Sequence, residues 1–237
     1  MISNTDIFGA AVWDYYHKDY SSDIIVHSSI AEDDVMPIPY LFRSYDQMPA
    51  IEQKALSLAK GKTLDIGCCA GSHSLWLQEN EREVSGIDSS EGAVTLSRKR
   101  GLKNIIHSPI LHHKGSYNTL LLLMNGTGIF ENTSKIDMYL QHLKTLLTQN
   151  GQILIDGSDI KYMFENEDGS FWMDANKAYY GEVQMAMSYK NMKSDTFDWL
   201  YMDYETLSFY AKKNELNCEL ILKGNHYDYL ARLTSLK

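Results

Sequence analysis

The stretch TLDIGCCAGSHSLWLQ, residues 63–78, decides the fold that this sequence predicts. A short apolar strand, TLDIG (63–67), runs into a turn of small residues, and helical spacing of apolar residues follows over 72–79. Small residues at such a turn let a ligand approach the backbone closely. The stretch therefore predicts the first strand and helix of an α/β unit, with a ligand-binding turn between them.

Strands and helices alternate along most of the chain. The strands expected in the main sheet are residues 63–67, 83–88, 103–107, 118–124, 152–157, 218–224 and 226–234. The run NTLLLLM (118–124) is almost continuously apolar, which is typical of a parallel strand buried on both faces. This order predicts an α/β fold: a doubly wound, mostly parallel seven-stranded sheet of Rossmann-like type, with an antiparallel last strand.

Capping and turn residues set the other expected boundaries. The expected helices run from Ser89 or Ser90 to Arg100, from Ser134-x-x-Asp137 to Gly151, and from Asp203 to about Asn214. Residues 182–190 and 196–203 alternate as an extra β-hairpin. Gly224-Asn225 is the two-residue turn expected between the last two strands.

Two regions are expected along the chain. Residues 1–49 comprise an N-terminal helix, from Asn4 to Tyr20, and a lid segment without regular periodicity over 21–48. The lid contains MPIPYLFR (36–43), which is too apolar for an idle loop. Residues 50–237 form the α/β domain, beginning with a helix over 50–60 and interrupted by an insertion and hairpin at 157–202.

Composition excludes several function classes. With 22 basic against 31 acidic residues the chain carries a formal net charge of −9, which disfavours nucleic acid as a partner. No apolar run is long enough to cross a membrane, and the first residues do not resemble a signal peptide. Three cysteines, two of them adjacent, provide neither a disulfide framework nor metal-ligand spacing. We expect a cytoplasmic protein without a metal site.

A carboxylate ends the second expected strand. Asp88 lies 17 residues after Gly71, where it can accept hydrogen bonds from both hydroxyls of a ribose. The turn itself reads G-x-C-x-G rather than G-x-G-x-x-G, and Asp65, two positions before Gly67, would repel a pyrophosphate. The pair therefore predicts an adenosine-containing ligand, and favours a sulfonium nucleoside carrying an amino acid over a dinucleotide.

The chain resembles the class I S-adenosylmethionine-dependent methyltransferases over roughly residues 50–237. The resemblance is carried by LDIGCCAGSHS (64–74), VSGIDSS (84–90), YNTLLLLMNGTG (117–128), LLTQNGQILIDGSD (146–159) and HYDYLARL (226–233). It implies S-adenosyl-L-methionine as cofactor. It also implies cofactor contacts from the turn and the second strand: Asp65, Gly67, Cys68, Cys69, Gly71, Asp88 and Ser89.

The resemblance implies further contacts elsewhere. Ser108 stands where the family often has an aspartate that contacts the adenine. Met124 and Asn125 match positions that face the methionine part of the cofactor. Arg43 or Tyr40 would contact the cofactor carboxylate or close over it.

Cys69 departs from the family, which usually has glycine at this position. A negative φ would leave the thiol lining the pocket, and this is what we expect. A positive φ would cost about 1–3 kcal/mol and would weaken cofactor binding. A redox or nucleophilic role is disfavoured, because neither Cys68 nor Cys69 has an evident base partner and adjacent cysteines are not a C-x-x-C motif.

The expected function is methyl transfer to a small-molecule acceptor by in-line displacement, with catalysis by positioning. Residues 36–43 and the 157–202 insertion, including Trp172, would enclose the acceptor pocket. A general base is needed only if the acceptor must lose a proton, and the candidates are Asp159, Tyr179, Tyr180 and His112. A non-catalytic cofactor-binding protein and a nicotinamide-dependent oxidoreductase are the alternatives.

Overall fold

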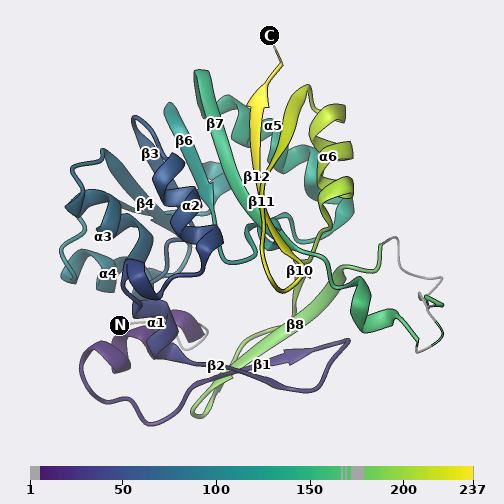
Figure 1. Ribbon diagram of the computed structural model, residues 1–237. Helices are drawn as coiled ribbons and strands as arrows, with labels where there is room; N and C mark the ends of the chain where they lie inside the picture. The colour runs from purple at the N-terminus through teal and green to yellow at the C-terminus, as the bar shows by residue number, and fades with distance from the viewer. Residues whose placement is uncertain (1–5, 167, 169, 172–178, 237) are drawn as a thin grey trace.

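Two sheets build the protein. The computed structural model describes residues 6–166, 168, 170, 171 and 179–236. The main sheet has seven strands in the order β11-β12-β7-β6-β3-β4-β5 (Figure 1). These strands are β3 (Thr63–Ile66), β4 (Val84–Asp88), β5 (Ile105–His107), β6 (Tyr117–Leu122), β7 (Leu147–Ser158), β11 (Leu216–Lys223) and β12 (Asp228–Ser235). β3 to β7 pair in parallel, whereas β12 is antiparallel to both neighbours, so the predicted fold class is confirmed.

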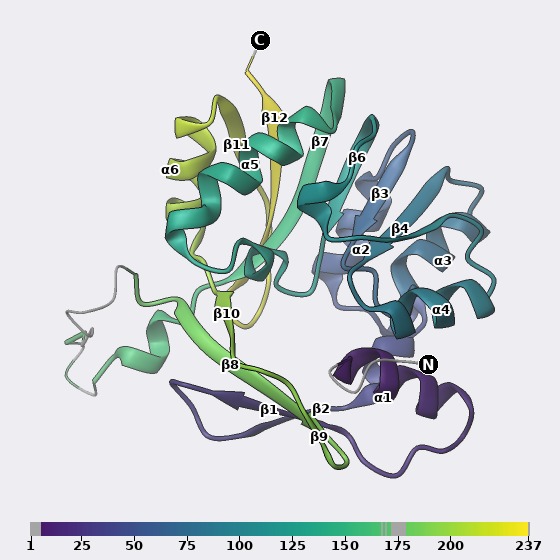
Figure 2. The same ribbon diagram turned by 180° about the vertical axis from the view of Figure 1, so that it is seen from behind.

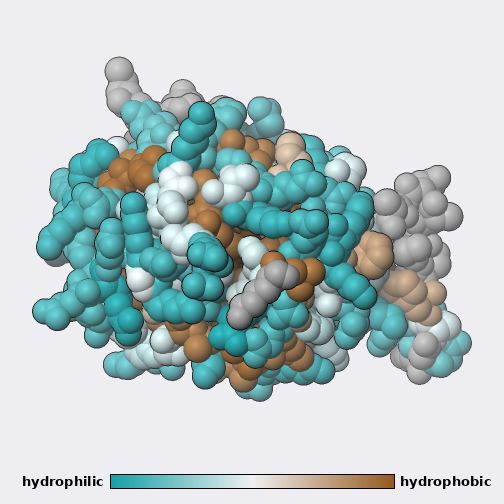
Figure 3. All heavy atoms as spheres, turned by 90° about the horizontal axis from the view of Figure 1, so that it is seen from above, coloured by the Kyte–Doolittle hydropathy of each residue, from teal (hydrophilic) through white to brown (hydrophobic). Residues whose placement is uncertain are grey.

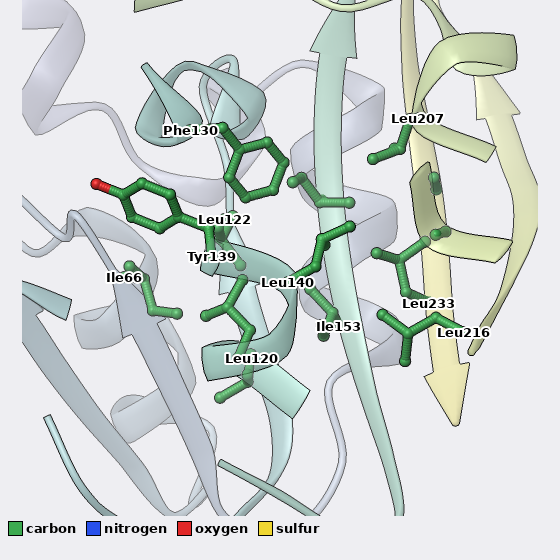
Figure 4. Packing of buried hydrophobic residues seen from close by; sticks show 14 of the residues in the cluster. Ile66, Leu120, Leu122, Phe130, Tyr139, Leu140, Ile153, Leu207, Leu216 and Leu233 are labelled. Carbon is green, nitrogen blue, oxygen red and sulfur yellow. The ribbon is translucent and has the colours of Figure 1, made fainter. Parts of the chain in front are cut away.

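Helices cover both faces of this sheet (Figures 1 and 2). They are α2 (Ala50–Leu58), α3 (Ser72–Glu79), α4 (Glu91–Lys99), α5 (Ile136–Thr145) and α6 (Tyr204–Lys213), whereas α1 (Ile7–Tyr16) packs against α4. Along β6, Leu120 and Leu122 point into the core under α5 and α6, and Leu121 points into the core under α2 and α3. Each of these side chains is at most 1% exposed and contributes about 1.5–3 kcal/mol by burial. Figure 4 shows Leu120, Leu122, Leu140 and Phe130 converging in the first of these cores.

The second sheet joins two segments that are distant in sequence. It has the order β10-β8-β1-β2, with β9 paired to β8. The strands are β1 (Ile24–Ser28), β2 (Asp34–Met36), β8 (Glu182–Tyr189), β9 (Met192–Lys193) and β10 (Phe197–Leu200). In both ribbon views this sheet lies beneath the carboxyl ends of the parallel strands (Figures 1 and 2).

The second sheet corrects the prediction for residues 21–48. The predicted hairpin of β8 and β10 is confirmed, but the segment expected to be irregular supplies β1 and β2. β2 has three residues and β1 lacks strict alternation of exposed and buried positions, so neither shows the period-2 pattern from which strands are predicted. β1 becomes a strand by pairing with β8, which starts at Glu182, and β2 becomes one by pairing with β1.

Several predicted boundaries were wrong. The helix expected to reach Gly151 ends at Thr145, because Leu147 already pairs with Tyr117 in the sheet. That helix also lacks a side-chain cap, so Ser134-x-x-Asp137 does not open it. α1 is shorter than the expected span from Asn4 to Tyr20.

The turn between the last two strands also differs from its prediction. It covers residues 224–227 rather than Gly224-Asn225 alone, with Tyr227 at a φ of 59°. The backbone N–H of His226 donates to Asp228 Oδ1 at 3.0 Å and helps to hold this wider turn.

Hydrophilic residues cover most of the face seen from above, and hydrophobic residues show between them (Figure 3). Within the described residues, no helix has the length and apolar character needed to cross a bilayer. The same part of the chain contains no group of three or more His, Cys, Asp or Glu side chains arranged to hold a metal ion.

Candidate functional site

The turn between β3 and α3 lies at the carboxyl edge of the sheet. Gly67 has a φ of 74°, and a Cβ there would meet no atom within 4 Å, so its outer side is open. Gly71 has a φ of 82° and sits against Ser97, whose Oγ would be 3.0 Å from an added Cβ. The turn is tied to β4 by the Gly67 N–H, which donates to Ile87 O at 2.9 Å. Gly67 thus faces the space that a ligand would use, and Gly71 packs inward.

Cys69 does not have the negative φ expected from the sequence. Its φ is 46°, in the left-handed region that favours glycine and costs other residues about 1–3 kcal/mol. Two hydrogen bonds hold it there: its N–H donates to Asp88 Oδ2 at 2.8 Å, and its carbonyl accepts from Ser97 Oγ at 2.7 Å. The expectation failed because these backbone contacts, rather than the side chain, decide the conformation.

The two adjacent thiols are poorly suited to redox or nucleophilic chemistry. Cys68 is 6% exposed, and burial raises the pKa of its thiol well above the usual range. Burial, with the charge of Asp88, likewise raises the pKa of Cys69. Thiolate is the reactive form, so both cysteines act as small packing residues.

Asp88, at the end of β4, lies directly beside the turn. Its Oδ2 accepts from the Cys69 N–H, and its Oδ1 accepts from the Ser90 N–H at 2.8 Å. Burial raises the pKa of Asp88, and these two N–H groups oppose that shift. A carboxylate offers about four lone-pair positions, so two hydroxyl donors can still be accommodated.

The two serines predicted near Asp88 lie close to it. Ser90, not Ser89, caps α4 by accepting from the Ala93 N–H at 2.9 Å, and Ser89 is exposed. Ser108 follows β5, and its backbone N–H donates to the Asp88 carbonyl at 3.0 Å. The structure therefore brings Ser89, Ser108 and Asp88 together at one edge.

Met124 and Asn125 form a strained turn after β6. Both have positive φ, 67° and 60°. A carboxylate that the sequence analysis missed holds this turn: Asp156 of β7 accepts from the Met124 N–H at 3.0 Å and from the Gly126 N–H at 2.7 Å. Burial raises the pKa of Asp156 to about 6, despite these hydrogen bonds. The sequence signal that could have identified Asp156 is its position as an acid near the end of an otherwise apolar strand, QILIDG.

A buried ion-pair cluster lies between the lid segment and α3. Glu52 of α2 accepts hydrogen bonds from Arg43 Nη2 and from His73 Nε2, the latter at 2.6 Å, and all three residues are at most 8% exposed. Burial alone would raise the pKa of Glu52, but His73 and Arg43 outweigh it and hold the pKa below its usual range. The sequence analysis missed Glu52, because one acid in a short helix resembles an exposed residue.

One donor of this cluster has no partner. Arg43 Nη1 donates to the Tyr40 carbonyl, and the guanidinium stacks on the Tyr40 ring with 4.0 Å between Arg43 Cζ and the ring centroid. Arg43 Nε is buried without a hydrogen-bond partner in the described part of the chain. An unpaired buried donor costs about 1–3 kcal/mol, which an added acceptor would recover.

Asp65 lies inside the sheet rather than on the open side of the turn. It is 2% exposed, and its Oδ2 accepts from Ser74 Oγ at 2.6 Å. Burial raises its pKa, and nearby His73 and Ser74 oppose the shift. Its side chain is therefore closed to direct contact with a ligand on the open side of the turn.

The candidate general bases fall in two places. Tyr180 Oη donates to Asp159 Oδ1 at 2.7 Å and lies 3.3 Å from Asp203 Oδ2. Tyr179 Oη donates to the same oxygen of Asp203. Burial raises the pKa of both tyrosines, so their hydroxyls remain protonated. Trp172 lies outside the described residues.

His112 lies away from the other three candidates. It lines an open hollow of about 550 Å³ with His113 and His142. His113 Nε2 lies 2.8 Å from the hydroxyl of Tyr117, the first residue of β6. The hollow is therefore at the amino edge of the sheet, opposite the turn.

Comparisons with known proteins agree with this geometry. A family model described as a methyltransferase domain matches residues 64–155. Among solved structures, a SAM-dependent methyltransferase from Bacteroides fragilis, in complex with S-adenosyl-L-homocysteine, is 42% identical. That match covers 100% of this chain and 98% of the relative, with a TM-score of 0.93.

More distant structures share the fold alone. An S-adenosylmethionine-dependent methyltransferase from Clostridium acetobutylicum is 14% identical, covers 78% of this chain and 89% of its own, and has a TM-score of 0.57. DesVI from Streptomyces venezuelae is 13% identical, and the match covers 84% of this chain and 96% of DesVI, with a TM-score of 0.59. No match is found among curated proteins.

Proposed function

Because this chain belongs to the class I S-adenosylmethionine-dependent methyltransferases, we propose that it transfers a methyl group to a small-molecule acceptor. The family and the cofactor rest on the full-length identity with the Bacteroides fragilis enzyme. The observation that carries the site assignment is the Asp88 carboxylate, held by two backbone N–H groups beside the open Gly67 turn.

The residues at the β4 edge fit the adenosine part of the cofactor. Asp88 would accept both ribose hydroxyls with its remaining lone pairs. Gly67 would allow close approach of the ligand to the backbone, with Cys68 and Cys69 continuing the turn and Gly71 at the N-cap of α3. Ser89 and Ser108, beside Asp88, would border the adenine.

The residues around α2 and α3 fit the amino-acid part. The unpaired Arg43 Nε would donate to the carboxylate, and Tyr40 would cover it. Met124 and Asn125, held by Asp156, would face the methionine chain. The carboxylates of Asp65 and Asp156 would favour the cationic end of the ligand.

When bound, S-adenosylmethionine supplies an electrophilic methyl carbon on a positively charged sulfur. The chain's own contribution would be to position the acceptor and to exclude water. The inner face of the second sheet is apolar and rich in methionine and aromatic residues: Met185, Met187, Val183, Phe197 and Trp199. An apolar, aromatic neighbourhood of this kind would suit a small acceptor, and the net charge of −9 disfavours a nucleic acid.

Among the candidate bases, Asp159 fits the role best. The Tyr179 and Tyr180 hydroxyls already donate to carboxylates and hold their protons, whereas Asp159 is a carboxylate at intermediate exposure. It would accept the acceptor's proton, with Tyr180 holding it in place. We also propose a reducing, cytoplasmic location, because Cys68, Cys69 and Cys218 are free thiols.

Calorimetry with S-adenosylmethionine, S-adenosylhomocysteine and NAD tests the cofactor assignment. We expect both sulfur compounds to bind and NAD not to bind. Incubation with methyl-labelled cofactor and fractionated metabolites then tests the acceptor class. Label in a small-molecule fraction supports the proposal, whereas label recovered only in macromolecules, or in no fraction, contradicts it.

A further inference from the structure

Asp6 joins the N-terminal ends of two helices. Its Oδ1 accepts from the Gly9 N–H at 2.9 Å and caps α1, while its Oδ2 accepts from the Gly92 N–H of α4 at 2.9 Å. Ser90 Oγ donates to both oxygens, at 2.7 and 2.9 Å. A carboxylate at two helix N-termini is favoured by both helix dipoles. Asp6 therefore fixes α1 to the start of α4.

The two helices touch through their backbones. A Cβ added to Gly92 would lie 2.5 Å from Gly9 Cα, and one added to Gly9 would lie 2.7 Å from Gly92 Cα. No side chain can occupy either position unless the helices separate. The docked position of α1 thus depends on this pair of glycines.

The other end of α1 is bonded to the second sheet. Asp14 Oδ2 accepts from Tyr189 Oη at 3.0 Å and from Lys190 Nζ at 2.8 Å, at the end of β8. Between the two ends, one apolar cluster joins α1, the turn, α4 and the sheet. Its buried members include Ile7, Ala11, Val12, Ile24, Ala70, Leu96, Met187 and Tyr189.

We propose that α1 is a clamp that couples cofactor binding to the docking of β8, with Asp6 as its positioning residue. The connection begins at Asp88, which accepts from the Ser90 N–H at 2.8 Å, and Ser90 Oγ in turn donates to Asp6. It continues along α1 to Asp14, which accepts from Tyr189 Oη of β8. A ligand that fixes Asp88 and the turn stabilises docked α1, and docked α1 strengthens ligand binding by the same factor. The inference rests on the proposed cofactor site.

Amide hydrogen exchange with and without S-adenosylhomocysteine tests the clamp. In the wild type we expect the ligand to slow exchange in α1 and β8 by about tenfold. Asp6→Asn keeps the side-chain shape but loses an acceptor, and Gly92→Ala forces the helices apart. Both variants should bind the ligand about 5–10-fold more weakly and lose the ligand-dependent slowing in β8. Glu91→Gln, an exposed change in the same turn of α4, should behave like the wild type.

Two results would overturn the clamp alone: ligand binding without slower exchange in α1 and β8, or full affinity and slowing in both variants. Melting followed by circular dichroism confirms that each variant is folded, and Asp6→Asn provides the test if Gly92→Ala does not fold. If the wild type fails to bind S-adenosylhomocysteine, the proposed cofactor site falls and the clamp falls with it.

Discussion

Replacing Cys69 by alanine and by glycine would measure the strain in the turn, because the two variants differ by one methyl group. Alanine keeps a Cβ on a backbone with a φ of 46°, which costs an L-residue about 1–2 kcal/mol. Glycine escapes that cost but gives the unfolded chain more freedom, which lowers stability by about 0.4–1 kcal/mol. We therefore expect the glycine variant to be more stable than the alanine variant by roughly 0.5–1 kcal/mol. For a chain of this size, that is about 1–4 °C in melting temperature.

Cys68 supplies the matched control. It is not among the described residues with positive φ, so there the order should reverse, with alanine more stable than glycine. Urea and thermal unfolding of the four variants would measure both differences. A glycine variant less stable than the alanine variant at position 69 would refute the left-handed conformation. The N–H that donates to Asp88 is kept in Cys69→Gly, so affinity for S-adenosylhomocysteine should be equal or higher, and a loss of more than tenfold would contradict this reasoning.

Three further predictions concern the buried charges. Asp88→Ala should weaken binding of S-adenosylhomocysteine by about 10–100-fold in calorimetry, because charge-assisted hydrogen bonds to the ligand are lost. Unchanged affinity would show that Asp88 does not contact the ligand. The pKa of Asp156, about 6, lies above its unfolded value, so the folded state keeps a proton that the unfolded chain releases first. The free energy of unfolding of the wild type, relative to that of Asp156→Asn, should therefore be highest below about pH 4 and fall by up to about 3 kcal/mol by pH 7 in urea titrations. A difference between the two proteins that does not change with pH would argue against a raised pKa. Arg43→Ala leaves Glu52 without its cation and should cost about 3–5 kcal/mol in thermal or urea unfolding, whereas Arg43→Lys should cost less; equal losses would mean that charge is not what Glu52 requires.

The sequence predicted the main sheet because its information is local. Most parallel strands contain a short apolar run, such as Leu120–Leu122 in β6, and turn or capping residues such as Ser90 mark the ends of these runs. β1 and β2 were not predictable in this way, because β1 pairs with the distant β8 and β2 pairs with β1.

The same difference between local signals and long-range contacts decides which site residues could be predicted. The turn and Asp88 could be found because their spacing in the chain is itself the signal. Glu52, Asp156 and Asp6 could not be assigned roles, since each acts through partners on other elements: Arg43, the Met124 turn and α4. The sign of φ at Cys69 could not be predicted either, because hydrogen bonds from its backbone to the Asp88 and Ser97 side chains determine it.

The long separation between β1 and β8 has a consequence during synthesis. His27 and Ser188, which share a hydrogen bond, are 161 positions apart. At about 5–20 residues per second, a ribosome needs roughly 8–30 s to supply the partner strand. During that interval the edge of Ile24–Ser28 that pairs with β8 has no partner, so the nascent chain is open to non-native strand pairing until residues 182–189 have emerged.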